Sequence, residues 1–349
     1  MPPSFGFTLE VDQLEALDKF DALIDVRSPA EFELDHLPNA VNYPVLDDTQ
    51  RHEVGLLHAK DSFAARRLGA AWVASNCAHH IETHLMHHSR HWRPLVYCWR
   101  GGQRSGALVH ILHQIGWPAM QLIGGYKTWR RRVIDDLATW PQRFDFKIIS
   151  GPTGCGKSRL LEALRANGAQ VLHLEQIANH KGSILGSEGL QPGQRLFETR
   201  LWEALRGLDP GRPVFAEAES RRIGRVALPE QLLLALRSAK CLRIEAPLPA
   251  RVAFLLADYA PRLKQPEWLI GHLQKFIPMH GAQKTTQWCE QVNQRDFRTL
   301  TEDLLTSHYD QLYRKSLAGN YTRPVCTLEI DDLSTQGINA LARRLPECL

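Results

Sequence analysis

A cysteine begins a glycine-rich loop in the first half of the chain. The segment YCWRGGQRS, residues 97–105, follows a short apolar run and precedes a stretch with helical periodicity. Backbone N–H groups in such a loop point inward, and the N-terminus of the following helix adds positive potential. We therefore expect Cys98 to be a thiolate nucleophile; a buried structural cysteine is the alternative. The residues predicted to act with it are the glycines that let the loop fold tightly and the arginine that could clamp an anion: Gly101, Gly102 and Arg104.

A second glycine-rich loop opens the other half of the chain. Residues 151–158, GPTGCGKS, fit the pattern G-x-x-x-x-G-K-[ST] at every fixed position. A predicted strand at 147–150 precedes this loop and a predicted helix at 159–166 follows it, which is the context of a phosphate-binding loop. Its N–H groups would cradle a diphosphate, its lysine would reach a terminal phosphate, and its serine could ligate Mg²⁺. The predicted phosphate-binding residues are Gly151, Thr153, Gly154, Gly156, Lys157 and Ser158.

Polar residues further along the chain could complete this phosphate site. An apolar run beginning at 213 leads to Glu217, which we predict to hold Mg²⁺ together with Ser158. Glu219 is the alternative acid, because a continuing strand would place it on the same face as Glu217. Solvation of a strand end is the other interpretation of both acids. Further candidates for contacts with phosphate or substrate are Arg221, Arg251 and His180, the last in the polar loop 179–186.

Two layered α/β units would position these loops. Short apolar runs bounded by turn residues predict buried strands, and helical stretches lie between them. A helix should begin at Pro29 with Ser28 as its N-cap, and Trp140–Pro141 should end another helix. The chain is therefore predicted to be α/β, with a parallel-sheet domain at 11–138 and a P-loop NTPase-like domain at 144–349. The strands are expected at 22–26, 40–44, 95–97, 121–123, 144–150, 171–174, 213–220 and 241–246.

The composition is that of a globular protein in a reducing environment. Of the 349 residues, 44% are hydrophobic and 23% are charged. No run is long and apolar enough to span a membrane, and the N-terminus lacks the pattern of a secretory signal. The 7 cysteines contain no CxxC pair, which argues against a zinc or disulfide framework. We expect a cytoplasmic protein without a membrane partner.

Basic clusters leave room for a nucleic-acid partner. The net charge of +4 neither requires nor excludes one. Arginines at 130–132 and at 221–225 could hold phosphates, although solvated helix faces would have the same composition. Trp129 and Trp140 lie near the first cluster and could stack on a base, with core packing as the alternative.

Residues 11–138 resemble a rhodanese domain. Three separated segments carry the resemblance in the family's order: LIDVRSPAEF (23–32), HLPNAVNYP (36–44) and LIGGYKTW (122–129). Five residues separate Cys98 from Arg104, one more than in the usual sulfurtransferase loop. The longer loop is similar to that of rhodanese-like phosphatases and arsenate reductases. Such a loop could admit a phosphate or a chalcogen larger than sulfur.

The chain as a whole resembles the tRNA 2-selenouridine synthase family. A rhodanese domain is followed at once by a P-loop domain, which contains the segments HKGS (180–183) and EAESRRIG (217–224). The resemblance implies a transferase that converts wobble 2-thiouridine in tRNA to 2-selenouridine through S-geranyl-2-thiouridine. Its substrates would be geranyl diphosphate and selenophosphate, with Cys98 as selenium carrier through a perselenide. No tightly bound cofactor is implied, and Mg²⁺ is a possible ion.

The resemblance also implies partners and leaves alternatives. The partners would be the anticodon arm of tRNA and an enzyme that supplies selenophosphate. One alternative is a rhodanese-type sulfurtransferase, phosphatase or arsenate reductase built on the Cys98 loop. Another is a P-loop kinase with a rhodanese module, which would turn over ATP. A binding module without turnover is disfavoured because Cys98, Arg104 and Lys157 are all present.

Overall fold

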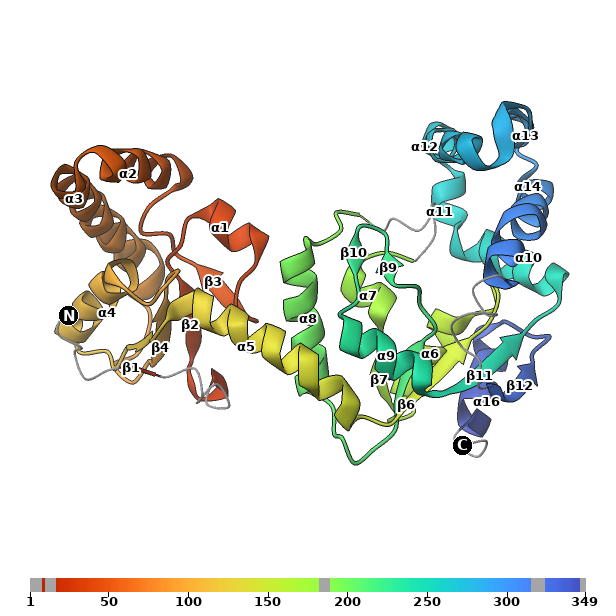
Figure 1. Ribbon diagram of the computed structural model, residues 1–349, viewed down its shortest axis with the longest axis horizontal. Coiled ribbons are helices and arrows are strands. Elements are labelled where there is room, and N and C mark those ends of the chain that lie inside the picture. Colours follow the sequence, from red (N-terminus) through yellow and green to blue (C-terminus); the bar gives the residue numbers. More distant parts are fainter. Residues whose placement is uncertain (1–7, 10–16, 182–188, 315–323, 346–349) are drawn as a thin grey trace. The chain divides into compact units, whose positions relative to one another are not determined.

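The computed structural model of the protein (Figure 1) describes residues 8–9, 17–181, 189–314 and 324–345. The chain divides into two compact units. The first comprises Met1–Asp136 and Glu198–Glu203, and the second comprises Leu137–Phe197 and Ala204–Leu349.

The first unit is built on a five-stranded parallel sheet. Its strand order is β1-β5-β4-β2-β3, so that β4 is the middle strand. All four residues of β4 are buried, as expected for a strand that helices cover on both faces. The four strands predicted for this unit are present, and the short β1 was not predicted. The bounds are β1 Thr8–Leu9, β2 Ala22–Asp25, β3 Ala40–Asn42, β4 Pro94–Tyr97 and β5 Met120–Leu122.

The helices of the first unit connect these strands. Helix α1 begins at Pro29 with Ser28 as N-cap, as predicted, and the Ser28 N–H donates to the Glu31 carboxylate at 3.2 Å. Helix α5 ends at Thr139, and Trp140–Arg143 form a 3-10 turn, so the proline breaks the helix where predicted. The helices are α1 Pro29–Leu34, α2 Asp48–Lys60, α3 Ser62–His80 with the π-helical turn Ile81–Leu85, α4 Gln103–Ile115 and α5 Gly125–Thr139.

The second unit also contains a five-stranded parallel sheet. Its order is β12-β11-β6-β8-β7, with β6 in the middle. Strand β8 ends at Glu217, so the prediction that it continues to residue 220 was wrong. The Ala218 N–H makes the last ladder bond, to the Ile149 carbonyl, and the chain then leaves the sheet. The bounds are β6 Phe146–Ser150, β7 Gln170–Leu172, β8 Val214–Glu217, β11 Lys240–Glu245 and β12 Pro324–Glu329.

Helices and one short hairpin surround this second sheet. Helix α6 begins at Lys157, directly after the phosphate loop, and its buried face of Leu160, Leu161 and Leu164 packs on the sheet core. Strands β9 (Arg222–Ile223) and β10 (Val226–Ala227) form an antiparallel hairpin. The helices are α6 Lys157–Ala166, α7 Leu174–Ala178, α9 Glu230–Ser238, α10 Leu248–Asp258 and α16 Thr335–Arg344. Helix α8, Gln194–Arg206, is shared between the units, because its residues Glu198–Glu203 belong to the first.

A helical cluster in the second unit was not predicted. Its core contains Phe276 and Trp288, which are completely buried. The helices that enclose them are α11 Ala260–Leu263, α12 Pro266–Leu273, α13 Ile277–Asn293 and α14 Phe297–Leu304. Among the described residues, no helix has both the length and the apolar character needed to cross a membrane.

Candidate functional site

Cys98 lies at the carboxyl end of the middle strand β4, and its side chain is only 3% exposed. Two donors point at its sulfur: the Gly102 N–H at 3.3 Å and the Ser105 hydroxyl at 3.2 Å. Ser105 lies in the first turn of α4, so the positive end of this helix faces the same sulfur. Hydrogen bonds of this kind stabilise negative charge on the acceptor, which suits a nucleophilic sulfur.

Side-chain and backbone contacts hold the Cys98 loop in shape. The Gln121 amide donates to the carbonyls of Gly101 (2.7 Å) and Gly102 (3.0 Å). Gly101 has a φ of +61°, and a Cβ there would lie 2.4 Å from the Leu122 carbonyl oxygen. Gly102 has a φ of −102°, and a Cβ there would meet open space. The predicted steric need for glycine therefore applies to Gly101, whereas Gly102 contributes its N–H group.

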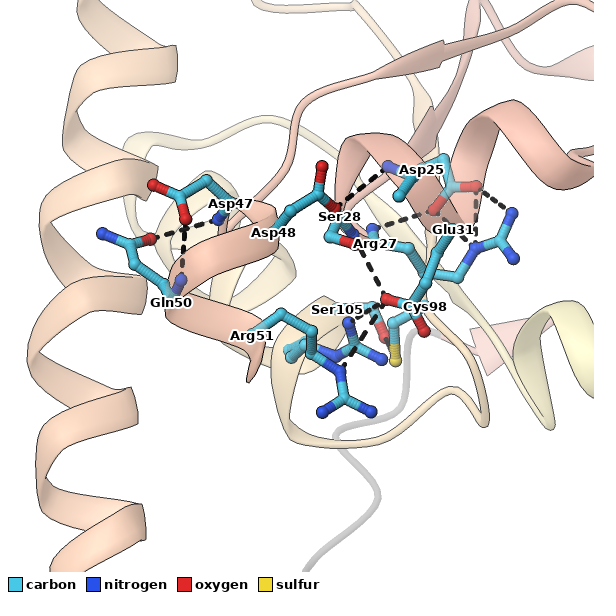
Figure 2. A network of polar contacts seen from close by, with 12 residues as sticks. Asp25, Arg27, Ser28, Glu31, Asp47, Asp48, Gln50, Arg51, Cys98 and Ser105 are labelled. Atoms are coloured by element: carbon cyan, nitrogen blue, oxygen red, sulfur yellow. Dashed lines mark hydrogen bonds and ion pairs between the residues drawn. The ribbon is translucent and has the colours of Figure 1, made fainter. Parts of the chain in front are cut away.

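Arg104 meets a carboxylate beside this loop. Its guanidinium donates to Glu31 Oε2 at 2.9 Å, and Arg51 Nε lies 3.9 Å from the same oxygen (Figure 2). Burial acts to raise the pKa of Glu31, but the hydrogen bond and charge of Arg104 outweigh it, and the pKa is lowered. An anion that binds Arg104 next to Cys98 would therefore compete with Glu31 for the guanidinium.

Arg51 reaches this network from helix α2, in the segment between β3 and β4. The Asp48 carboxylate at the start of α2 accepts the Ala30 N–H at 3.0 Å, which ties α2 to α1 (Figure 2). Sequence reasoning missed both Glu31 and Arg51 as neighbours of the loop. Glu31 lies in the first turn of the helix predicted to begin at Pro29, and no local pattern links it or Arg51 to a cysteine so distant in sequence.

The phosphate loop follows the middle strand β6 of the second unit. Gly154 and Gly156 have φ values of +84° and +79°, which favour glycine. A Cβ on Gly151 would lie 2.5 Å from both Cys155 Sγ and the Ile244 carbonyl oxygen, so the loop backbone is closely packed. The Lys157 ammonium donates to the Gly151 carbonyl at 2.8 Å. This lysine thus lies over its own loop, where the phosphates of a ligand would bind.

Three side chains from neighbouring elements meet beside Ser158. The Ser158 hydroxyl donates to Glu175 Oε2 at 2.8 Å. Glu217 Oε1 accepts the Glu175 backbone N–H at 2.6 Å and lies 3.2 Å from His173 Nδ1. Burial acts to lower the pKa of His173, but the hydrogen bond and charge of Glu217 raise it overall. Burial and the Glu217 charge raise the pKa of Glu175.

Sequence reasoning missed Glu175 and His173. Both follow β7 directly, and the carboxyl ends of parallel strands meet at one edge of a sheet. The strand predicted at 171–174 ran past the true end of β7 and obscured this position. The apolar run before His173 was the available signal.

The predicted Mg²⁺ ligands, Ser158 and Glu217, lie around the same residue, Glu175. Glu217 is 1% exposed, and its Oε2 has no hydrogen-bond partner among the described residues. The described residues contain no group of three or more His, Cys, Asp and Glu side chains suited to a metal. Mg²⁺ needs only one or two carboxylates when water and phosphates complete its shell, so Ser158 and Glu217 fit this ion.

Glu219 does not lie on the face of a strand with Glu217, because β8 has ended. Its side chain is half-buried nearby. Burial, together with the charges of Glu175 and Glu217, raises the pKa of Glu219 well above its usual value. Glu219 therefore lies near Glu175 and Glu217, but on a segment that has left the strand.

The other candidates lie around the loop in different ways. Arg251 is buried beneath it: Nε donates to the Thr153 carbonyl at 2.8 Å, and both terminal nitrogens bind Asp310 at 3.0 and 2.6 Å. Its guanidinium is therefore committed to holding the loop. His180 packs against Gly224 of the β9–β10 hairpin, and Arg221 is exposed before that hairpin. Residues 182–186 of the predicted substrate loop lie outside the described residues.

Comparisons with known proteins match both units. Residues 10–132 match the rhodanese-like domain, and residues 144–276 match the tRNA 2-selenouridine synthase AAA domain. A tRNA 2-selenouridine synthase of Marinobacter nauticus is 37% identical over 322 residues, covering 91% of this chain and 81% of the relative. This chain belongs to the tRNA 2-selenouridine synthase family. The predicted order of a rhodanese-like fold and a P-loop-type α/β fold is thereby confirmed.

Other relatives in the tRNA 2-selenouridine synthase family are similar over part of their length. The synthase of Nitrosomonas europaea is 36% identical over 256 residues, which cover 71% of this chain and 66% of that protein. The match thus spans just under two thirds of that relative. Among solved structures, a rhodanese-related protein of Thermoplasma volcanium is 19% identical over 36% of this chain and 92% of its own, with a TM-score of 0.25.

Proposed function

We propose that this chain converts 2-thiouridine in tRNA to 2-selenouridine through S-geranyl-2-thiouridine, with a separate loop for each step. The observation that carries the proposal is the presence of both loops in one member of this family. Cys98 has two donors on its sulfur, and Lys157 and Ser158 stand at the start of α6.

The phosphate loop would serve the first step. The sulfur of 2-thiouridine attacks the first carbon of geranyl diphosphate, the carbon–oxygen bond breaks, and diphosphate leaves as the base loses its N3 proton. Loop N–H groups and Lys157 would bind the departing diphosphate, whose charge grows as the bond breaks. Ser158 and Glu217 would hold Mg²⁺ against it, and that ion would supply further charge neutralisation. ATP hydrolysis is not required for this chemistry.

The Cys98 loop would serve the second step. Selenophosphate bound beside the Cys98 thiolate attacks C2 through its selenium: a carbon–selenium bond forms, the carbon–sulfur bond breaks with release of geranylthiol, and water then cleaves the selenium–phosphorus bond. Over the whole step one selenophosphate and one water are consumed, and geranylthiol and phosphate are released. The Gly102 N–H and the Ser105 hydroxyl would stabilise negative charge on the Cys98 sulfur, and Arg104 would bind the phosphate part of selenophosphate.

Mass spectrometry of tRNA nucleosides tests the proposal in cells that depend on this protein. Cys98→Ser should abolish 2-selenouridine while S-geranyl-2-thiouridine accumulates. Lys157→Ala should abolish the geranylated nucleoside. Cys289→Ser and Lys275→Ala, in the helical cluster, are the matched controls and should leave both nucleosides at normal levels. Persistence of 2-selenouridine in Cys98→Ser would exclude a role of Cys98 in selenium incorporation, and normal geranylation in Lys157→Ala would exclude the diphosphate site.

A further inference from the structure

One tryptophan lies beside Cys98 without being part of the core. Trp99 follows the cysteine directly and is partly exposed. Three other tryptophans of this unit are buried: Trp129 is completely inaccessible, Trp92 is 5% exposed and Trp117 is 6% exposed. Trp72, on helix α3, is partly exposed but far in sequence from the cysteine. The possibility that Trp129 stacks on a base is therefore ruled out by its burial. Trp99 is partly exposed, and it stands one residue from the predicted nucleophile.

The indole of Trp99 packs against a buried tyrosine, which other buried groups hold in place. Its ring lies 5.2 Å from the ring of Tyr126, which is 2% exposed. The Tyr126 hydroxyl donates to Asp35 at 2.7 Å, and the Arg27 guanidinium lies 4.0 Å from the Tyr126 ring centre. Arg27 in turn pairs with the buried Asp25 at 2.6 Å. These contacts fix Tyr126, so that the indole rests on a rigid surface.

The backbone fixes Trp99 relative to Cys98. The Tyr126 N–H donates to the Cys98 carbonyl at 2.8 Å, and the Lys127 N–H donates to the Trp99 carbonyl at 2.9 Å. Gly125 allows this close approach, since a Cβ there would lie 2.2 Å from the Cys98 carbonyl oxygen. These backbone contacts thus hold a flat aromatic residue directly next to Cys98 in the loop. A plain anion such as thiosulfate gains nothing from such a surface, whereas a nucleobase does.

We propose that Trp99 is a positioning residue whose indole stacks on the pyrimidine that reacts at Cys98. The inference rests on the proposed function, because it takes the substrate of this loop to be a tRNA base. Stacking of a base on an aromatic side chain is insensitive to the substituent on C2, so one platform accepts the base before and after selenium enters. Arg100, the next residue, is exposed and can meet a neighbouring phosphate.

A double-mutant cycle between protein and RNA tests the stacking. Affinities of the wild type and Trp99→Ala are measured by fluorescence anisotropy for two anticodon stem-loops, one with the wobble base and one abasic at that position. Removing the indole should weaken binding of the first RNA by about 5- to 150-fold, which corresponds to one stacked base. It should not weaken binding of the abasic RNA. Trp99→Phe should restore part of the affinity, and Phe63→Ala, which removes an exposed ring on α3, should change neither value.

The outcomes separate the inference from the proposed function. Equal losses for the two RNAs in Trp99→Ala would overturn the stacking, because the indole would then act on something other than the base. If the wild type binds neither stem-loop and produces no 2-selenouridine, the proposed function itself fails and the inference falls with it. If the wild type forms 2-selenouridine but the affinity losses from removing the indole and the base are additive, only the stacking is overturned.

Discussion

The Cys98 loop and the phosphate loop have the same structural setting. Each leaves the middle strand of a five-stranded parallel sheet and leads into a helix. Each includes a glycine with positive φ, and each is approached closely by a neighbouring backbone: Gly125 contacts the first loop and Ile244 the second. The shared strand–loop–helix geometry supplies N–H groups and a helix N-terminus to both loops.

The loops differ in the side chains that surround them. Cys98 receives hydrogen bonds from a neutral N–H and a hydroxyl, and the Arg104–Glu31 pair lies at its side. The phosphate loop carries Lys157 and faces the Glu175–Glu217 cluster. Under the proposed function, one backbone scaffold would hold a nucleophile in the first unit and a diphosphate in the second. The two loops differ in their own side chains, such as Cys98 and Lys157, and in the residues that neighbouring elements bring to them.

A methyl group added at Gly125 should disrupt the Cys98 loop alone, and one added at Gly151 should disrupt the phosphate loop alone. In Gly125→Ala the new Cβ would lie 2.2 Å from the Cys98 carbonyl oxygen, and in Gly151→Ala it would lie 2.5 Å from the Ile244 oxygen. We expect each change to cost about 2 to 5 kcal/mol in its own unit. Nucleoside analysis should show loss of selenium incorporation in the first variant and loss of geranylation in the second.

Gly69→Ala is the control for these variants. Its Cβ would lie 3.5 Å from Val54, an ordinary contact, and alanine favours the helix α3 by about 1 kcal/mol. It should leave both steps intact. If Gly125→Ala and Gly151→Ala abolish the same step, the two loops do not act independently.

Removal of Arg251 should destabilise the phosphate loop, although the Arg251 guanidinium is bound to the loop and to Asp310 and would not contact a phosphate ligand. Arg251→Ala leaves Asp310 without its bidentate partner and the Thr153 carbonyl without a donor. Because this ion pair is largely buried, we expect a loss of roughly 3 kcal/mol in the unfolding free energy of the second unit, measured by urea denaturation. Arg159→Ala, which removes an exposed pair with Asp258, should cost less than about 1 kcal/mol. Equal costs would show that Arg251 has no special role under the loop.

The acidic cluster should make the two units respond differently to pH. The folded pKa of Glu175 is above 4.5, so the folded chain retains a proton that the unfolded chain releases. Stability from this group is therefore full at low pH and is lost as pH rises from 4.5 through the raised value. The opposite holds for Glu31, whose lowered pKa makes its contribution present above 4.5 and lost on acidification.

Glu175→Gln tests this difference. The amide oxygen can still accept the Ser158 hydroxyl, but no charge develops beside Glu217. Relative to the wild type, the variant should gain stability as the pH rises from 4.5 through the raised pKa of Glu175, measured by chemical denaturation at each pH. Glu162→Gln, on the exposed face of α6, should show no such trend. A constant difference between Glu175→Gln and the wild type would contradict the assigned direction.

Much of the framework could be predicted from the sequence because its signals are local. The capped start of α1, the break at Trp140–Pro141 and the phosphate-loop pattern each depend on a few adjacent residues. The family resemblance rested on motifs of the same kind. Such patterns define which elements form and in what order.

The rest depends on contacts between distant segments. Glu31 and Arg104 are 73 positions apart, and His173 and Glu217 are 44 apart, so no periodicity connects them. Strand β8 ends two residues before Glu219 because the ladder with β6 ends, which is a property of the partner strand. Arg251 was a candidate for phosphate contact because it lies on a helix after the strand predicted at 241–246, an order that resembles the late strand and lid region of P-loop kinases. Only the position of Asp310 shows that its guanidinium is already bound.

A sequential reaction with purified variants tests the division of labour most directly. Cys98→Ser is first incubated with thiolated tRNA and geranyl diphosphate, and the tRNA is then purified and given to Lys157→Ala with selenophosphate. The account predicts S-geranyl-2-thiouridine after the first incubation and 2-selenouridine after the second, although neither variant alone completes both steps. Failure of Lys157→Ala to convert the geranylated tRNA, under conditions in which the wild type does so, would contradict the assignment of one step to each loop.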